Sequence, residues 1–184
     1  MYLAVLLALA FFQSGVSALP DASPVKVIDG GKPREYKPTA FNAGPAAGGA
    51  LNGHFFPSVI AYNTGRYGYA LTDLTFLINN NRVIDDNPRK PEFMSVSHYL
   101  RGMIYLYHAQ GVGRHELAKA DFEAAIQWNP TNYVAYLELS RVYSDLGLYK
   151  EATSIVQHVL ELKPPRDVAD EAEQELKKLA NRPL

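Results

Sequence analysis

The fold of this chain is decided by the stretch YVAYLELSRVYSDLGLYKEATSIVQHVLELKP, Tyr133 to Pro164. Its apolar residues recur at helical spacing on both sides of Gly147, which predicts two helices joined by a turn at this glycine. Ala152 is small where two antiparallel helices approach closely. The stretch therefore reads as one complete helix–turn–helix unit.

The segment before this stretch repeats the pattern, and Pro130 and Pro164 stand 34 residues apart. The matching positions are His98, Gly102, Tyr105, Ala118, Phe122, Ala125 and Pro130 in the first segment and Tyr136, Leu139, Ser140, Tyr143, Ala152, Val156 and Pro164 in the second. With this spacing both segments resemble the tetratricopeptide repeat family, whose 34-residue signature is W-x2-L-G-x2-Y, then A-x3-F, then P. Two departures stand out. Arg101 replaces the expected Leu, and four extra residues in the turn Gln110 to Glu116 predict a protruding loop.

A third, degenerate repeat precedes these two. GRYGYALTDL, Gly65 to Leu74, shares Gly-x-Tyr-x-x-Ala with GLYKEATSIV, Gly147 to Val156. The two glycines are 82 residues apart instead of the 68 expected for two repeats. The loop insertion accounts for four of the extra residues, and the polar stretch Asn79 to Glu92 accounts for the rest. The first helix of this repeat is predicted to begin at Pro57 and to run to about Asn63.

The C-terminal stretch RDVADEAEQELKKLANR, Arg166 to Arg182, carries one apolar stripe. The stripe consists of Val168, Ala172, Leu176 and Leu179. Such a helix caps a solenoid by covering the last repeat and turning its polar side to water. The expected fold class is all-α: a short solenoid of two clear and one degenerate tetratricopeptide-like repeats plus a C-terminal capping helix, preceded by an extended arm.

The first 18 residues are predicted to be a signal peptide. The apolar run Tyr2 to Phe12 is followed by Val16 and Ala18, which suit the positions before a signal-peptidase cut, although no Lys or Arg precedes the run. At about 11 residues the run is short for a membrane span, which needs about 20. We therefore expect periplasmic or secreted protein after cleavage near Ala18, with an uncleaved N-terminal membrane anchor as the alternative.

Residues 19–53 are rich in Pro, Gly and Ala and predict an extended arm. VKVID before Gly30 and Gly31 suggests a hairpin, but Pro33 would remove a ladder donor from the returning strand, which favours the unpaired arm. The complete expected organisation is a signal peptide at 1–18, the arm at 19–53, a degenerate repeat at 54–84, a polar linker at 85–94, a repeat with a loop insertion at 95–132, a repeat at 133–166 and a capping helix at 167–184.

Composition excludes several functions. The 18 Lys and Arg and 19 Asp and Glu are mixed along the chain, so no basic stripe points to nucleic acid. No cysteine is present, which excludes disulfides, thiolate zinc sites and thiol catalysis. His98, His108 and His115 are ten and seven residues apart, not the four that place a metal-binding pair on one helix face. We therefore expect no catalytic residues, no metal and no cofactor.

The resemblance implies a binding site on the concave face, which the first helix of each repeat lines in this family. The aligned residues are Phe55, Val59, Tyr62, Tyr99, Met103, Leu106, Tyr107, Leu137, Arg141 and Asp145. Each could instead be inter-repeat core. The set is mostly aromatic and apolar and favours an extended peptide or a partner helix. It argues against the Lys- and Asn-lined grooves that clamp a C-terminal carboxylate in some relatives, because only Arg141 could serve.

The sequence thus predicts a non-enzymatic protein–protein interaction module, a scaffold or assembly factor for a multiprotein complex in the bacterial cell envelope. The arm at 19–53 could bind in the module's own groove until a partner displaces it, because it is long enough to run the length of three repeats. The alternative is a constitutive structural subunit of a membrane-associated complex, docked through this arm. Contact with the membrane is expected only through the N-terminal segment if that segment stays uncleaved.

Overall fold

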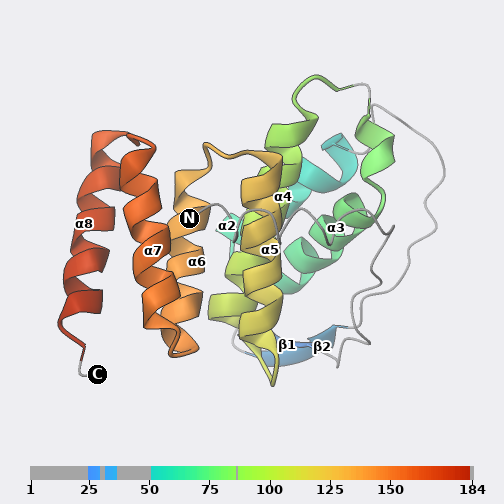
Figure 1. Cartoon of the computed structure of the whole chain (residues 1–184). Coiled ribbons are helices and arrows are strands. Elements are labelled where there is room, and N and C mark those ends of the chain that lie inside the picture. Colours follow the sequence, from blue (N-terminus) through green and yellow to red (C-terminus); the bar gives the residue numbers. More distant parts are fainter. Residues whose placement is uncertain (1–24, 30–31, 37–50, 86, 183–184) are drawn as a thin grey trace, which may run out of the picture.

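The computed structural model describes residues 25–29, 32–36, 51–85 and 87–182 of the chain. Within this part, seven α-helices form a stack in which each helix packs against the next in the chain. Figure 1 shows α8, α7 and α6 side by side at one end of this stack. The helices are α2 (Phe56–Asn63), α3 (Tyr67–Asn79), α4 (Lys90–Met103), α5 (Arg114–Trp128), α6 (Tyr133–Asp145), α7 (Tyr149–Glu161) and α8 (Arg166–Ala180). The all-α solenoid is therefore confirmed, whereas the segment 1–18 lies outside the described residues.

Glycine and proline mark the helix boundaries as the sequence predicts. Gly65 and Gly147, which lie in the turns before α3 and α7, have φ values of +72° and +77°, in the region that favours glycine. Pro57 lies in the first turn of α2, where its missing N–H breaks no helical hydrogen bond. A π-helical turn, η1 (Leu51–Phe55), precedes α2.

The connection between the first two helix pairs is shorter than the polar linker expected at 85–94. A 3-10 turn, η2 (Asn81–Ile84), follows α3, and α4 already begins at Lys90. The reason is that Pro91 lies in the first turn of α4, where proline starts a helix instead of ending one.

Close packing between α4 and α5 explains the small residue at position 102. A Cβ added to Gly102 would lie 2.8 Å from Cε1 of Phe122, whose side chain is fully buried. Gly102 is therefore a second position, besides the predicted Ala152, where a small residue allows two helices to approach closely. Beyond Phe122, this core cluster contains buried Leu74, Ile104 and Val142, which belong to three different helix pairs.

The capping helix α8 covers the end of the solenoid through the predicted stripe. Ala172 and Leu179 are buried in a core cluster with Val156 and Val159 of α7. The other two stripe residues, Val168 and Leu176, pack against the same cluster. Figure 1 shows α8 beside α7 at the end of the stack.

The expectation of an unpaired arm is wrong for two segments within 19–53. Strands β1 (Val25–Asp29) and β2 (Lys32–Tyr36) pair antiparallel, and β1 also pairs antiparallel with β3 (Ala109–Gln110), giving the strand order β2-β1-β3. Pro33 lies opposite Ile28 on β2. It is tolerated because β2 is the edge strand, where a missing N–H need not interrupt a ladder on both sides.

The loop insertion after α4 is partly ordered by this pairing. α4 continues as a π-helical turn, η3 (Ile104–His108), and β3 follows directly. The Nη1 of Arg114 donates a hydrogen bond to the carbonyl of Leu106 at 3.1 Å. Val112 is fully exposed, so the predicted protrusion is confined to the tip of the turn. The first residues of the insertion instead hold the arm's hairpin.

Candidate partner-binding face

The ten residues predicted to line the concave face lie in three kinds of environment. Phe55, Leu106 and Leu137 are buried in core clusters at 7%, 4% and 1% exposure and do not line an exposed surface. The partly exposed residues are Val59, Tyr62, Tyr99, Met103 and Arg141, and the exposed residues are Tyr107 and Asp145. For the three buried residues the inter-repeat core interpretation holds.

A polar cluster forms around Glu138 of α6. The hydroxyl of Tyr107 in η3 donates a hydrogen bond to Oε2 of Glu138 at 2.6 Å. Arg141, one turn further along α6, pairs with Oε1 of the same carboxylate and also with Oε1 of Glu171 in α8. Side-chain contacts of this cluster thus connect η3, which follows α4, with α6 and with the capping helix α8.

The charge of Glu138 also acts on two more tyrosines, Tyr99 and Tyr62. Burial raises the pKa of Tyr99 to about 12, and the nearby carboxylate of Glu138 adds to the effect. Burial also raises the pKa of Tyr62, with smaller contributions from Tyr67 and Glu138. We use the name Tyr–Glu face for the surface made by these side chains. Its members are Tyr62, Tyr99, Tyr107, Glu138, Arg141 and Glu171.

Glu138 and Glu171 were not predicted as site residues. Glu138 is only 6% exposed, and burial raises its pKa although Tyr107 and Arg141 act in the opposite direction. Its i,i+3 spacing to Arg141 is a sequence signal for an ion pair on one helix face. Glu171 is not part of the predicted apolar stripe of the capping helix, yet its carboxylate pairs with Arg141 of α6. Arg141 itself already pairs with two carboxylates of the protein.

Asp145, the last predicted residue, has its ion-pair partner on another helix. Its carboxylate is 3.6 Å from the Nε2 of His115 at the start of α5. The C-terminal end of α6 therefore faces the second helix of the preceding pair.

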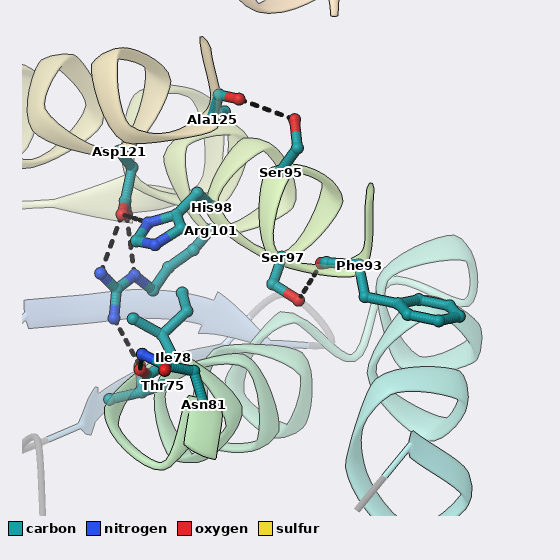
Figure 2. A network of polar contacts seen from close by, with 10 residues as sticks. All are labelled: Thr75, Ile78, Asn81, Phe93, Ser95, Ser97, His98, Arg101, Asp121 and Ala125. Atoms are coloured by element: carbon teal, nitrogen blue, oxygen red, sulfur yellow. Dashed lines mark hydrogen bonds and ion pairs between the residues drawn. The ribbon is translucent and has the colours of Figure 1, made fainter. Parts of the chain in front are cut away.

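A second polar network is buried inside the solenoid (Figure 2). Asp121 of α5 accepts hydrogen bonds from the Nε and Nη2 of Arg101 at 2.8 Å each, and the Nδ1 of His98 lies 2.8 Å from its Oδ1. The Nη1 of Arg101 reaches Oγ1 of Thr75 in α3 at 3.5 Å. Asp121 and Arg101 are 3% and 4% exposed. This network links α3, α4 and α5. Arg101, which stands where the repeat signature has Leu, has Asp121 as its acidic partner.

The histidines are dispersed through the described structure. His54 contacts Asp73, His158 contacts Glu161, and His108 stacks on the ring of Tyr67 with centroids 3.6 Å apart. Among the described residues, no three His, Asp or Glu side chains are grouped so that they could hold a metal ion. None of the described helices has both the length and the apolar composition needed to cross a membrane.

Comparison with known proteins agrees with this architecture. Residues 109–170 match the model of the tetratricopeptide repeat family. The structure is similar to the first repeat domain of Spaghetti (RPAP3) bound to the HSP90 peptide SRMEEVD, with a TM-score of 0.53 and 21% identity over 74% of this chain and 94% of that one. It is also similar to the repeat domain of Arabidopsis OM64, with a TM-score of 0.54 and 22% identity over 72% of this chain and 98% of that one. No curated protein matches the sequence.

Both structural similarities extend beyond the family match and cover most of the helical part. They support the tetratricopeptide-like solenoid as the fold of this protein. The class of protein that the fold and the Tyr–Glu face define is a helical-repeat protein with a polar and aromatic surface on the first helices of its repeats.

Proposed function

We propose that this protein is a non-enzymatic protein–protein interaction module that serves as a scaffold or assembly factor for a multiprotein complex in the bacterial cell envelope. The observation that carries the proposal is the Tyr–Glu face. Tyr62, Tyr99 and Tyr107 come from successive parts of the solenoid and stay partly exposed around one charged cluster. Tyrosine rings provide contact area at low entropic cost and are enriched in protein interfaces.

The partner segment is an extended peptide or a helix. The fold likeness to the Spaghetti domain, whose structure contains a bound peptide, supports this choice. That peptide is SRMEEVD, which is acidic. In this chain Arg141 is already paired with Glu138 and Glu171. We therefore expect SRMEEVD to bind this protein weakly or not at all, and calorimetric titration of the purified protein with this peptide tests that expectation.

The predicted signal peptide at 1–18 supports the envelope location. The proposal places cleavage near Ala18 and the mature protein in the periplasm or outside the cell, with membrane anchoring through the uncleaved segment as the alternative. The mass of the protein isolated from its own cells separates the two. A chain beginning at Leu19 supports export with cleavage, whereas the full mass in the membrane fraction supports the anchor.

The N-terminal arm allows a second role, as the docking element of a structural subunit. One observation favours it: β2 is an edge strand, so its outer side can pair with a strand of another protein. Strand β1 pairs with β3, and both β1 and β2 contact α3. Deleting residues 19–53 distinguishes the roles, because a docking arm predicts loss of assembly and an arm that occupies the groove predicts tighter partner binding.

The decisive experiment is photo-crosslinking in intact cells. A photoreactive residue replaces Tyr107, which is 48% exposed, and the same residue at Tyr69 of α3, 60% exposed, is the control. One foreign protein captured at position 107 and absent at position 69 supports the proposal. Capture of residues 19–53 at position 107 supports an arm that occupies the face. Absence of any adduct at position 107 contradicts the proposed role, as does substrate turnover by the purified protein alone.

A further inference from the structure

The Tyr–Glu face carries more negative than positive charge. Glu138 and Glu171 share one guanidinium, that of Arg141. Among the described residues, no other Lys, Arg or His forms an ion pair with either carboxylate. Two carboxylates and one guanidinium leave a net charge of −1 when all three are ionised, so the cluster is not neutralised within the protein.

The accessible part of this charge lies at Glu171. Its side chain is 46% exposed, whereas that of Glu138 is 8% exposed and both of its oxygens have partners. Arg141 contacts Glu171 through a single oxygen, Oε1. A carboxylate has about four acceptor positions, so the exposed oxygen of Glu171 retains hydrogen-bonding capacity.

Aromatic rings complete the surroundings of this carboxylate. Tyr107 is about half-exposed and is bound to Glu138, and Tyr99 is partly exposed and near the same carboxylates. A cation gains from an aromatic face as well as from a carboxylate, and the gain grows as water is removed. An anionic group would instead be repelled by the carboxylates, which one guanidinium does not neutralise.

We propose that the Tyr–Glu face selects its peptide through one cationic side chain, Lys or Arg, which pairs with Glu171 and packs against the rings of Tyr99 and Tyr107. This inference rests on the proposed function, because it names the chemistry of the partner segment at that face. It reverses the charge preference expected of a groove that clamps a carboxylate.

The test begins with selection from a phage-displayed library of random 12-residue peptides against the full-length purified protein. An enriched peptide is then synthesised with a fluorescent label, and its affinity is compared with that of a version in which each Arg is replaced by citrulline or each Lys by norleucine. The citrulline side chain keeps the shape of Arg and removes its charge. The neutral version should bind about tenfold more weakly, a loss typical of a charge-assisted contact.

The variant Glu171→Gln assigns the effect to this site. It should weaken binding of the cationic peptide about tenfold and leave the neutral version unchanged. Glu173→Gln is the matched control: it makes the same charge change on the same exposed helix, two residues along and so on a different side of α8. The Glu173→Gln variant should bind the cationic peptide with an affinity within about twofold of that of the unchanged protein. The Glu171→Gln variant should fold, because the side chain of Glu171 is 46% exposed.

Each other outcome is informative. Enriched peptides without Lys or Arg that still require Tyr107 would overturn the charge preference and leave the proposed binding function standing. A cationic peptide that binds the Glu171→Gln and Glu173→Gln variants equally well would also overturn the inference. If no peptide is enriched, both the proposed function and the inference fail.

Discussion

Both carboxylate oxygens of Asp121 accept a hydrogen bond from the guanidinium of Arg101, each at 2.8 Å, in the interior of the solenoid. Arg101 occupies a position where the repeat signature has Leu, so an apolar contact is replaced by an ion pair. Removing one partner of a buried pair leaves an uncompensated charge, whereas replacing both by apolar groups is often neutral. Arg101→Leu alone should therefore lower the free energy of unfolding by about 3–5 kcal/mol.

The double variant Arg101→Leu with Asp121→Leu is the control for this prediction. It should recover most of the loss, because no buried charge is left without a partner. Urea denaturation of both variants measures the difference. A double variant as unstable as the single one would show that the network contributes specific packing that Leu cannot replace.

The same network should make stability depend on acid pH. Burial disfavours the ionised carboxyl of Asp121, but the charge of Arg101 and the hydrogen bonds from His98 and Arg101 outweigh burial and hold its pKa below the usual value. A lowered pKa contributes stability above the unfolded pKa of about 3.9, and this contribution is lost as pH falls from there through the folded pKa. Denaturation curves measured from about pH 6 to about pH 2 should show a free energy of unfolding that falls with pH. Asp121→Asn should make this fall smaller.

Tyrosine burial predicts a loss of stability at alkaline pH. Burial raises the pKa of Tyr99 and of Tyr105 to about 12. A tyrosine in the unfolded chain ionises at about pH 10. The contribution of these two buried tyrosines to the free energy of unfolding is therefore complete below that pH and is lost as pH rises toward 12. Absorbance titration should show a late-ionising group of tyrosines that includes Tyr99, Tyr105 and also Tyr107, whose pKa is raised by burial and by the hydrogen bond to Glu138. Tyr99→Phe and Tyr105→Phe should each remove one tyrosine from this late phase, and a late phase of unchanged amplitude in both variants would contradict the assignment.

Two serines of α6 should be replaceable with a gain in stability. Ser140 and Ser144 are 0% and 3% exposed, and neither Oγ has a hydrogen-bond partner in the described structure. A buried hydroxyl without a partner carries a desolvation cost, and Ala is the better helix former. Each Ser→Ala change should raise the free energy of unfolding by about 1 kcal/mol.

The comparison for the two serines is Ser95→Ala. The hydroxyl of Ser95 donates to the carbonyl of Ala125 at 2.8 Å and accepts from the side chain of Asn132 at 2.9 Å. Its removal should therefore destabilise the protein by about 1–2 kcal/mol. Equal effects at all three serines in thermal unfolding would contradict the distinction.

The contact between Gly102 and Phe122 predicts an overpacking penalty. Gly102→Ala places a methyl group 2.8 Å from a fully buried ring. The change should cost about 1–3 kcal/mol, offset in part by the helix preference of Ala. Adding Phe122→Leu should restore part of the loss in chemical denaturation, and additive losses would show that the ring is not the obstacle.

The hairpin should protect the loop insertion. β1 pairs with Ala109 and Gln110, so deleting residues 19–53 removes the partner strand of β3. Hydrogen exchange at positions 109 and 110 should then accelerate, while exchange in α7 stays unchanged, because a repeat contacts only its neighbours. Unchanged exchange at β3 would show that the strand is held by η3 and Arg114 alone.

Much of the fold could be predicted because its signals are local. Helical spacing, the turn glycines at 65 and 147, the early proline at 57 and the small residue at 102 each act within one helix or one helix pair. The hairpin was judged wrongly because Pro33 was weighed without knowing that β2 lies at the edge of the sheet. The linker was overestimated because Pro91 marks a helix start as well as it marks a loop.

The sequence by itself determined the number, order and pairing of the helices, since periodicity and turn chemistry act over a few residues. Only the tertiary structure decided which polar side chains meet. Arg141 and Glu171 are 30 residues apart and Tyr107 and Glu138 are 31 apart, so their contacts depend on how successive helix pairs are rotated against one another. The pairing of β1 with β3 is non-local for the same reason: Val27 and Ala109 are 82 residues apart, and the packing of the helices between them brings the two strands together.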